Sequence, residues 1–216
     1  MYRPIRWLAD QASTAFTNII DGVVARNPDR YPTVKKFKDE SIYDTPTAVH
    51  SKGYFLSTLA EDLSRLPAPG EIRAHPEYSK TIIIVDVVGL GEINDKYNQV
   101  VGDKVLRYVT DTLKRSVRSG DVIGRYGGDE FAVQLPNATE EDARHIIGRI
   151  AQNFSYYKFR LPDDPEILDA LRGGRAGEDS ERGKGLVLRL GHATTYQPCD
   201  MEYLLKKADP KQPLID

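Results

Sequence analysis

The chain has 216 residues, of which 40% are apolar and 29% are charged, and its formal net charge is −2. This balance is typical of a globular protein with a buried core, and it argues against a basic nucleic-acid-binding surface or a polybasic membrane patch. Cys199 is the only cysteine, so an internal disulfide is excluded, and no apolar run approaches the ~20 residues that span a bilayer. We therefore expect a cytoplasmic protein without a membrane span.

The first 42 residues predict a helical extension ahead of the main domain. Apolar side chains recur at helical spacing through residues 5–25, and the stretch "RNPDRYP" then interrupts the pattern with two prolines. Two interpretations stay open, because this helix can pack against its own domain or pair with the same helix of a second subunit. Residues 43–216 are expected to form the main domain.

The first half of this domain predicts a helix, a buried strand and another helix. Apolar side chains recur at helical spacing in residues 52–66. The run "TIIIVDVVGL" (81–90) is rich in β-branched residues, as in a strand that is buried on both faces. A second helical pattern extends from Gly102 to Arg118.

The second half predicts a hairpin, a helix, a strand and a short helix. "DVIGRY" and "EFAVQLP" flank Gly127 and Gly128, which is the pattern of a β-hairpin. "NATEEDARHIIGRIAQNF" opens with Asn137 as a helix cap, and a charged, glycine-rich loop is expected near 158–185. "GLVLRLGHATTY" and "MEYLLKKAD" then predict a strand and a helix. The order indicates an α/β (α+β) fold, a central mixed β-sheet flanked by helices.

Three carboxylates fall where this fold can bring them together. Asp86 lies near the end of the buried strand, and Asp129 and Glu130 lie at the tip of the hairpin. Adjacent carboxylates repel one another unless a cation or protons compensate, and Mg²⁺ takes oxygen ligands and pairs with phosphates. A plain hairpin with solvated acids is the alternative from spacing alone.

Several motifs together resemble one family. Residues 127–131, "GGDEF", are the signature of the GGDEF family, the diguanylate cyclases, and "RSGDVIGRYGGDEF" has the spacing of its upstream RxxD element. "DVVGLGEINDKYNQVVGDKVL" (86–106), "RLGHAT" with "YLLKKAD", and "DTPTAVHSKGYF" (44–55) resemble further family segments, so the likeness extends over roughly 44–209. The resemblance implies a palm-like sheet, as in nucleotidyl cyclases. It also implies condensation of two GTP into cyclic di-GMP, with Mg²⁺ and release of pyrophosphate, by a bacterial homodimer.

The resemblance also implies roles for individual residues. The metal ligands are expected to be Asp86, Asp129 and the carbonyl of Val87, and the catalytic acids Glu130 and Asp129. The remaining GTP-binding positions are Asn94 and Asp103 at the guanine edge, the backbone amides of Gly89 and Leu90 at the phosphates, and Gly127 and Gly128 of the signature. Arg118 and Asp121 resemble an inhibitory site at which cyclic di-GMP restrains turnover.

Two departures from the family pattern concern the phosphates. Gly91 stands where the family usually has Lys, and "PKQPLID" replaces a basic helix, with Pro210 expected to stop the preceding helix. Lys211 is a substitute cation that no sequence feature fixes in place. Since a charge-assisted contact contributes roughly 1.5–3 kcal/mol, weak GTP binding is expected. The alternative function is therefore a catalytically weak or inactive module that binds cyclic di-GMP or GTP as a receptor.

Overall fold

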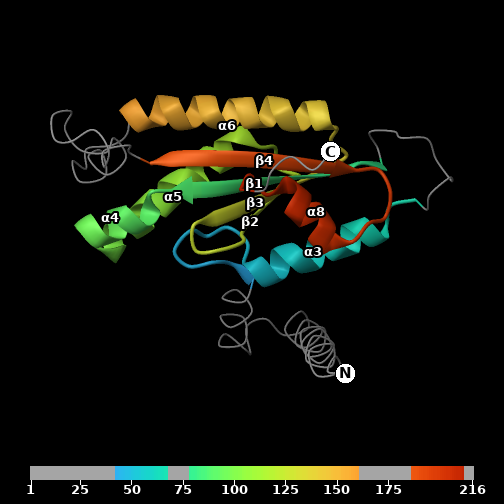
Figure 1. Cartoon of the computed structure of the whole chain (residues 1–216), viewed down its shortest axis with the longest axis horizontal. Coiled ribbons are helices and arrows are strands. Elements are labelled where there is room, and N and C mark those ends of the chain that lie inside the picture. The colour runs from blue at the N-terminus through green and yellow to red at the C-terminus, as the bar shows by residue number, and fades with distance from the viewer. Residues whose placement is uncertain (1–41, 68–77, 161–185, 212–216) are drawn as a thin grey trace, which may run out of the picture. The chain divides into compact units, whose positions relative to one another are not determined.

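The computed structural model describes residues 42–67, 78–160 and 186–211, and only the backbone of residues 156–160 (Figure 1). The predicted N-terminal helix and most of the charged loop lie outside these residues. The division into an extension (1–42) and a main domain (43–216) therefore stays a prediction.

Four strands and five helices make up the described part of the domain. In chain order they are α3 (Lys52–Ser64), β1 (Lys80–Val88), α4 (Leu90–Tyr97), α5 (Gln99–Ser116), β2 (Val122–Arg125), β3 (Glu130–Pro136), α6 (Glu140–Arg160), β4 (Val187–Thr195) and α8 (Met201–Ala208). The sheet order is β2-β3-β1-β4, which is the β-α-β-β-α-β arrangement of two interleaved βαβ units. The expected α/β layer fold is confirmed.

The strand pairs, however, are antiparallel rather than mixed. β1 pairs antiparallel with both β3 and β4, and β2 pairs antiparallel with β3. The crossover through α4 and α5 does make β2 run in the same direction as β1. The hairpin then places β3 between them, so the two like-directed strands are not neighbours.

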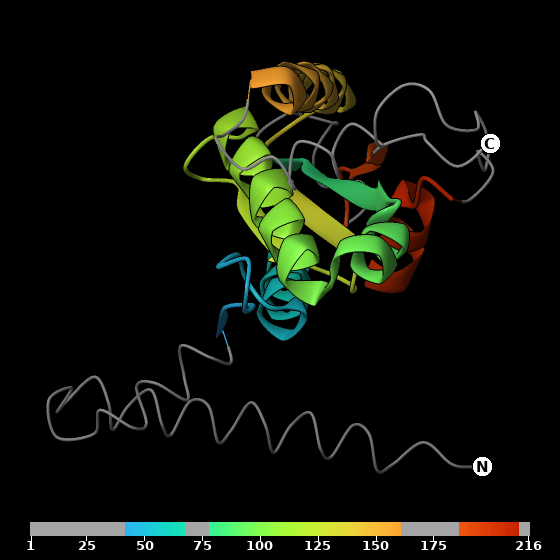
Figure 2. The same cartoon turned by 90° about the vertical axis from the view of Figure 1, so that its left-hand side faces the viewer.

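Both faces of β1 are buried, each under its own pair of helices. Ile83, Val85 and Val87 belong to the core beneath α5 and α6, whereas Ile82 and Ile84 belong to the core beneath α3 and α8. Figure 2 shows α5 and α8 on opposite sides of the sheet. Side chains alternate between faces along a strand, so the continuous apolar run predicted for β1 reflects burial on both sides.

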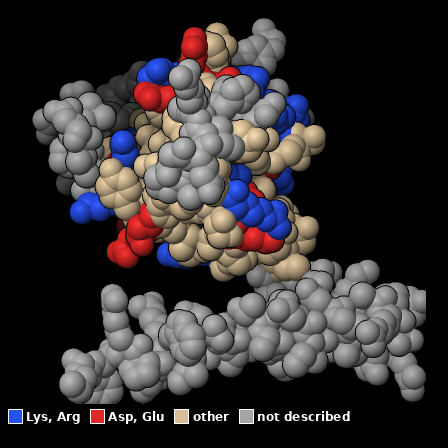
Figure 3. All heavy atoms as spheres, turned by 90° about the vertical axis from the view of Figure 1, so that its right-hand side faces the viewer, with Lys and Arg blue, Asp and Glu red and all other residues tan. Residues whose placement is uncertain are grey.

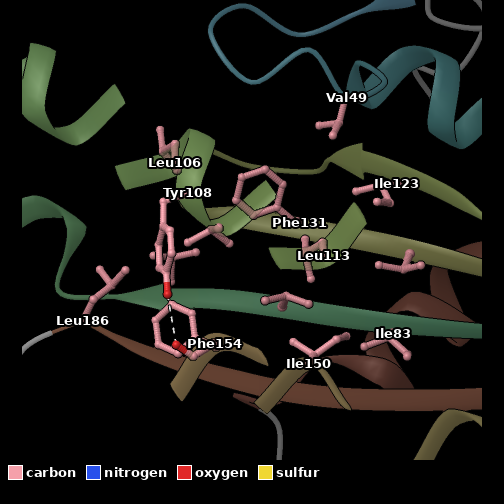
Figure 4. Packing of buried hydrophobic residues seen from close by; sticks show 14 of the residues in the cluster. Val49, Ile83, Leu106, Tyr108, Leu113, Ile123, Phe131, Ile150, Phe154 and Leu186 are labelled. Atoms are coloured by element: carbon pink, nitrogen blue, oxygen red, sulfur yellow. Dashed lines mark hydrogen bonds between the residues drawn. The ribbon is translucent and has the colours of Figure 1, made fainter. Parts of the chain in front are cut away.

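A buried hydroxyl joins α5 to α6 within their shared core. The Tyr108 hydroxyl of α5 donates a hydrogen bond to the Phe154 carbonyl of α6 at 3.0 Å, and the two rings lie against each other with centroids 5.7 Å apart (Figure 4). The bond satisfies a buried hydroxyl that would otherwise be costly to desolvate.

Two helix starts differ from the sequence expectation. The sequence did not predict α4, because an apolar pattern over eight residues is too short to show a helical period. Gly89 caps this helix with a φ of 99°. At α6, Thr139 is the cap instead of Asn137, because the Asn137 backbone turns into the left-handed region and donates to the Ser79 carbonyl at 3.0 Å. The Thr139 hydroxyl accepts from the Asp142 N–H at 3.2 Å.

The surface shown in Figure 3 intermixes basic and acidic side chains, which agrees with the small net charge of −2. Among the described helices, none combines the length and the apolar character needed to cross a membrane.

Candidate active site

The register of the sheet brings the three predicted carboxylates together. Asp86 and Glu130 are directly paired across β1 and β3, so their side chains lie on the same face of the sheet. The Val87 N–H donates to the Asp129 carbonyl at 2.9 Å, which fastens the hairpin tip to the end of β1. Carboxylate oxygens of Asp86, Asp129 and Glu130 all lie within 4.8 Å of one another.

Gly127 gives the Glu130 side chain room to fold back over the turn. A Cβ atom at Gly127 would lie 2.7 Å from Glu130 Oε2. The N–H groups of Tyr126 and Gly127 both donate to the Glu130 carbonyl, at 2.8 and 3.0 Å, and close the tip. The glycine therefore clears space for a carboxylate, as its place beside two acids suggested.

The Gly128 backbone is held by an arginine. Arg125 Nη2 donates to the Gly128 carbonyl at 2.6 Å, and Arg125 Nη1 donates to Asp44 Oδ2 at 3.1 Å. The hairpin tip is thus fastened to the segment that opens the domain.

The carboxylate cluster already attracts cationic side chains. Asp86 is only 3% exposed, and a buried carboxylate needs a charged partner. Lys211 Nζ lies 2.9 Å from Asp86 Oδ1 and 2.7 Å from Glu130 Oε1, whereas Arg189 Nη1 is 3.9 Å from Asp86 Oδ2. Hydrogen bonds to Glu130 and then Asp86 raise the pKa of Lys211 above its usual value, so its ammonium stays charged.

The donor set fits a divalent metal. All three side chains offer oxygen atoms, the ligands that hard divalent cations prefer, and the ammonium marks where positive charge is stabilised. The expectation that nothing fixes Lys211 is wrong, and sequence reasoning missed this contact because it joins residues 81 positions apart.

The two predicted guanine-reading residues meet where α4 packs on α5. The Asn94 side chain lies against Gly102, where any Cβ would overlap its amide oxygen. That oxygen is buried and has no hydrogen-bond partner among the described residues. Asp103, the next residue, is half-buried and accepts from Gln99 Nε2 at 3.3 Å. An amide and a carboxylate are side chains of the kind that pair with the edge of a guanine.

The predicted phosphate-binding amides lie at the start of α4. Gly89 caps the helix, its carbonyl accepts from the Ile93 N–H at 3.1 Å, and Leu90 begins the helix two residues after the end of β1. The first N–H groups of a helix have no partner within it and favour anions. Gly91 is exposed and has open space around it, so no side-chain cation stands at this position.

Arg118 and Asp121 form a pair at the other end of the sheet. Asp121 accepts from the backbone N–H and the Nε of Arg118, at 2.9 and 3.0 Å, and Arg118 Nη2 donates to the Pro136 carbonyl at 2.6 Å. Pro136 pairs with Lys80, six residues before Asp86 on β1, which is about 20 Å along a strand. The Arg118 side chain is 59% exposed and the Asp121 side chain is buried.

A cavity of about 260 Å³ opens beside Glu130, between the hairpin and α8. Its lining consists of Ile84, Tyr126, Glu130, Glu202, Leu205, Lys206 and Asp209. Burial, and then the nearby acids Glu130, Glu202 and Asp209, raise the pKa of the Tyr126 hydroxyl. Sequence reasoning missed this cavity, because its walls come from a hairpin and a helix that are distant in the sequence.

A β-α-β-β-α-β sheet with clustered carboxylates at the end of its central strands is the palm-like architecture of nucleotidyl cyclases. A family model described as "Diguanylate cyclase, GGDEF domain" matches residues 41–169, and the chain belongs to the GGDEF family.

Curated relatives and a solved structure agree with this assignment. Diguanylate cyclase DgcP of Pseudomonas aeruginosa is 30% identical over 112 residues, which cover 52% of this chain and 17% of that protein. Diguanylate cyclase DosC of Escherichia coli is 34% identical over 96 residues, covering 44% and 21%. The chain thus spans about a fifth of these relatives' length. The coiled coil and GGDEF domain of Caulobacter crescentus DgcB, solved with c-di-GMP, has a TM-score of 0.58 at 14% identity and 90% coverage of both chains, which shows a common fold.

Proposed function

We propose that the protein is a diguanylate cyclase that condenses two GTP into cyclic di-GMP and releases two pyrophosphates. The observation that carries the proposal is the cluster of Asp86, Asp129 and Glu130, whose carboxylate oxygens lie within 4.8 Å of one another. Family membership and the curated cyclases among its relatives support the same activity.

Each residue group of the site has a task in this reaction. Asn94 and Asp103 accept hydrogen bonds from the guanine edge, and the first amides of α4, beside Gly89 and Leu90, bind the phosphates. Asp86 and Asp129 would hold Mg²⁺, with the Val87 carbonyl as a further oxygen ligand. When bound, the metal neutralises phosphate charge, as metals do in phosphoryl transfer.

The chemistry is two identical displacements between two facing subunits. The 3′-oxygen of one GTP forms a bond to the α-phosphorus of the other, and the bond from that phosphorus to the oxygen bridging the β-phosphate breaks. The departing group is pyrophosphate, and the Glu130 carboxylate, freed from Lys211, accepts the 3′-hydroxyl proton. The same displacement, with the roles of the two nucleotides exchanged, then closes the cyclic dinucleotide.

Arg118 and Asp121 are the proposed product-binding pair. The buried Asp121 carboxylate holds Arg118 by its Nε and backbone N–H, and the exposed guanidinium matches the O6 and N7 acceptors of a guanine. Cyclic di-GMP bound there is proposed to restrain turnover from a distance, since the pair lies at the opposite end of β1 from the acids.

One observation favours a second candidate, a receptor that binds cyclic di-GMP or GTP without efficient turnover. Position 91 has a glycine with open space around it, so the phosphates lose a cation at the start of α4. The two candidates differ in whether the carboxylates act on bound GTP.

Product formation tests the proposal. Incubation of the full chain with GTP and Mg²⁺, followed by chromatography and mass spectrometry, is expected to yield cyclic di-GMP. Asp129→Asn is expected to lower the rate at least about 100-fold, because losing a metal-bound charge at a reacting phosphate costs several kcal/mol. Asp111→Asn, an exposed acid of α5 outside the site, is the matched control and is expected to retain the rate.

A chain that binds GTP but forms no cyclic di-GMP at any protein concentration would overturn the cyclase and leave the receptor. Equal GTP binding in Mg²⁺ by wild type, Asp86→Asn and Asp129→Asn would remove the metal assignment.

A further inference from the structure

We propose that Lys211 is a tethered counter-ion that competes with the divalent metal for Asp86, so that the site loads metal together with nucleotide rather than alone. The inference rests on the proposed metal site but not on turnover.

The contact occupies one carboxylate that the metal needs, Asp86, together with the adjacent Glu130. The ammonium nitrogen lies 2.9 Å from Asp86 Oδ1 and 2.7 Å from Glu130 Oε1, so it bridges β1 and β3 at their paired residues. Both distances are those of charge-assisted hydrogen bonds. A divalent cation that binds Asp86 has to displace this ammonium first, because two cations in one cluster of oxygens repel each other.

The backbone that carries Lys211 is held against the sheet. Gly191 of β4 pairs with Ile84 of β1, and a Cβ at Gly191 would overlap the Ala208 carbonyl and lie 3.0 Å from the Pro210 nitrogen. The end of α8 therefore rests directly on β4, on the face of the sheet that carries Asp86.

Two further features direct the side chain. Pro210 fixes its own φ and ends the helix after Ala208. The Asp209 side chain then accepts from the Lys211 N–H at 2.9 Å, which closes a turn. A short backbone segment that follows α8 and is held against the sheet thus carries the contact. The Lys211 side chain is 42% exposed, so its ammonium is able to leave the carboxylates.

Arg189 does not replace Lys211 in this role. Its guanidinium is 3.9 Å from Asp86 Oδ2 and its side chain is 55% exposed, and Asp129 adds a third negative charge to the cluster. Among the described residues, loss of Lys211 therefore leaves the buried Asp86 carboxylate with one distant cation, which strengthens its attraction for a metal.

A bound nucleotide weakens the competition between Lys211 and the metal. A triphosphate brings its own anionic oxygens, which accept the displaced ammonium, so the metal and the nucleotide enter together. Without nucleotide, the ammonium protects the paired carboxylates from mutual repulsion.

Direct metal binding tests the inference with the full chain. Free Mn²⁺, titrated with protein and followed by electron paramagnetic resonance, gives the metal affinity without any turnover. We expect Lys211→Met to bind Mn²⁺ about 10-fold more tightly than wild type when nucleotide is absent. Lys211→Arg, which keeps the cation, is expected to bind like wild type. The matched control is Lys207→Met, which removes an exposed charge from α8.

A second titration includes the α,β-methylene analogue of GTP, which cannot be attacked at its α-phosphorus with loss of pyrophosphate. The tighter binding by Lys211→Met is expected to disappear, because the ammonium of the wild type then has phosphate oxygens as partners. Far-ultraviolet circular dichroism verifies that each variant is folded.

The outcomes separate the inference from the proposed function. Equal Mn²⁺ affinity of wild type and Lys211→Met, with binding lost in Asp129→Asn, would overturn the competition and keep the metal site. An equal gain in Lys207→Met would also overturn it, because net charge alone would then explain the effect. Binding that Asp129→Asn leaves unchanged would overturn the metal site itself.

Discussion

At the scale of single residues, two glycines determine where functional side chains lie. Gly127 and Gly102 leave space for the side chains of Glu130 and Asn94. Among the described glycines only Gly89 has a positive φ, so at Gly127 and Gly102 the requirement is for space rather than for backbone conformation.

Gly102→Ala is expected to reduce the preference for GTP over ATP at least about 10-fold. The added methyl group would overlap the Asn94 amide oxygen, so the amide has to turn away from the base. An unpaired polar group on a buried base costs roughly 1–3 kcal/mol. Competition between GTP and ATP in the presence of Mg²⁺ measures the preference.

Gly148→Ala is the matched control, because Gly148 is an exposed helical glycine with open space at its Cβ. If Gly102→Ala and Gly148→Ala both kept the wild-type preference, Asn94 would have no part in reading the base.

Individual site residues were predictable to different degrees. The three acids were found because a buried strand and a glycine hairpin place them locally, and the register then pairs Asp86 with Glu130. Lys211 was not predictable as a partner, because its position depends on how α8 rests on Gly191 of β4.

At the scale of secondary structure, caps and breaks set the lengths of the elements that carry the site. The β-branched run made β1 predictable, and Pro210 correctly predicted the end of α8. α4 was missed because two turns of helix contain too few apolar positions for a period to appear. The α6 cap shifted from Asn137 to Thr139, because a tertiary bond to Ser79 holds Asn137 outside the helix.

Thr139→Ala is expected to lower the free energy of unfolding by about 1 kcal/mol. The Asp142 carboxylate accepts from the Thr139 N–H at 2.8 Å and from its hydroxyl at 2.7 Å. These bonds, the backbone one first, lower the pKa of Asp142 below its usual value of 3.8. Urea unfolding at pH 7 measures the loss.

The same cap predicts a dependence on pH with a definite sign. Because the pKa of Asp142 is lower in the folded chain, its stabilisation is present above the unfolded value of 3.8 and is lost as the pH falls through the folded pKa. The stability difference between wild type and Asp142→Ala is therefore expected to shrink when the pH is lowered from 7 to 3. A difference that stayed constant would show that the carboxylate charge has no part in the cap.

At the scale of the whole molecule, the layered fold was predictable and the assembly was not. The alternating strand and helix patterns are local features, so they can be predicted from the sequence. The strand order is not local, because it depends on the hairpin placing β3 beside β1. The proposed reaction adds a requirement that a single domain does not meet. Each chain has one carboxylate cluster among its described residues and one proposed guanine-reading pair, and a cyclic dinucleotide needs two of each. Whether the helix expected within residues 1–42 supplies the pairing stays a prediction.

The rate of cyclic di-GMP formation is therefore expected to depend on the square of the protein concentration when most subunits are monomeric. Twofold dilution in that range lowers the rate per subunit about twofold, because the population of pairs follows mass action. Mixing wild type with excess Asp129→Asn is expected to suppress the rate, since most wild-type subunits then face a site with a damaged metal cluster. The Asp111→Asn variant in the same excess is expected to sustain it. Product analysis across the dilution series, with light scattering in the presence of GTP, provides the measurement. A rate that stayed proportional to protein concentration while the chain remained monomeric would mean that two facing subunits are not required.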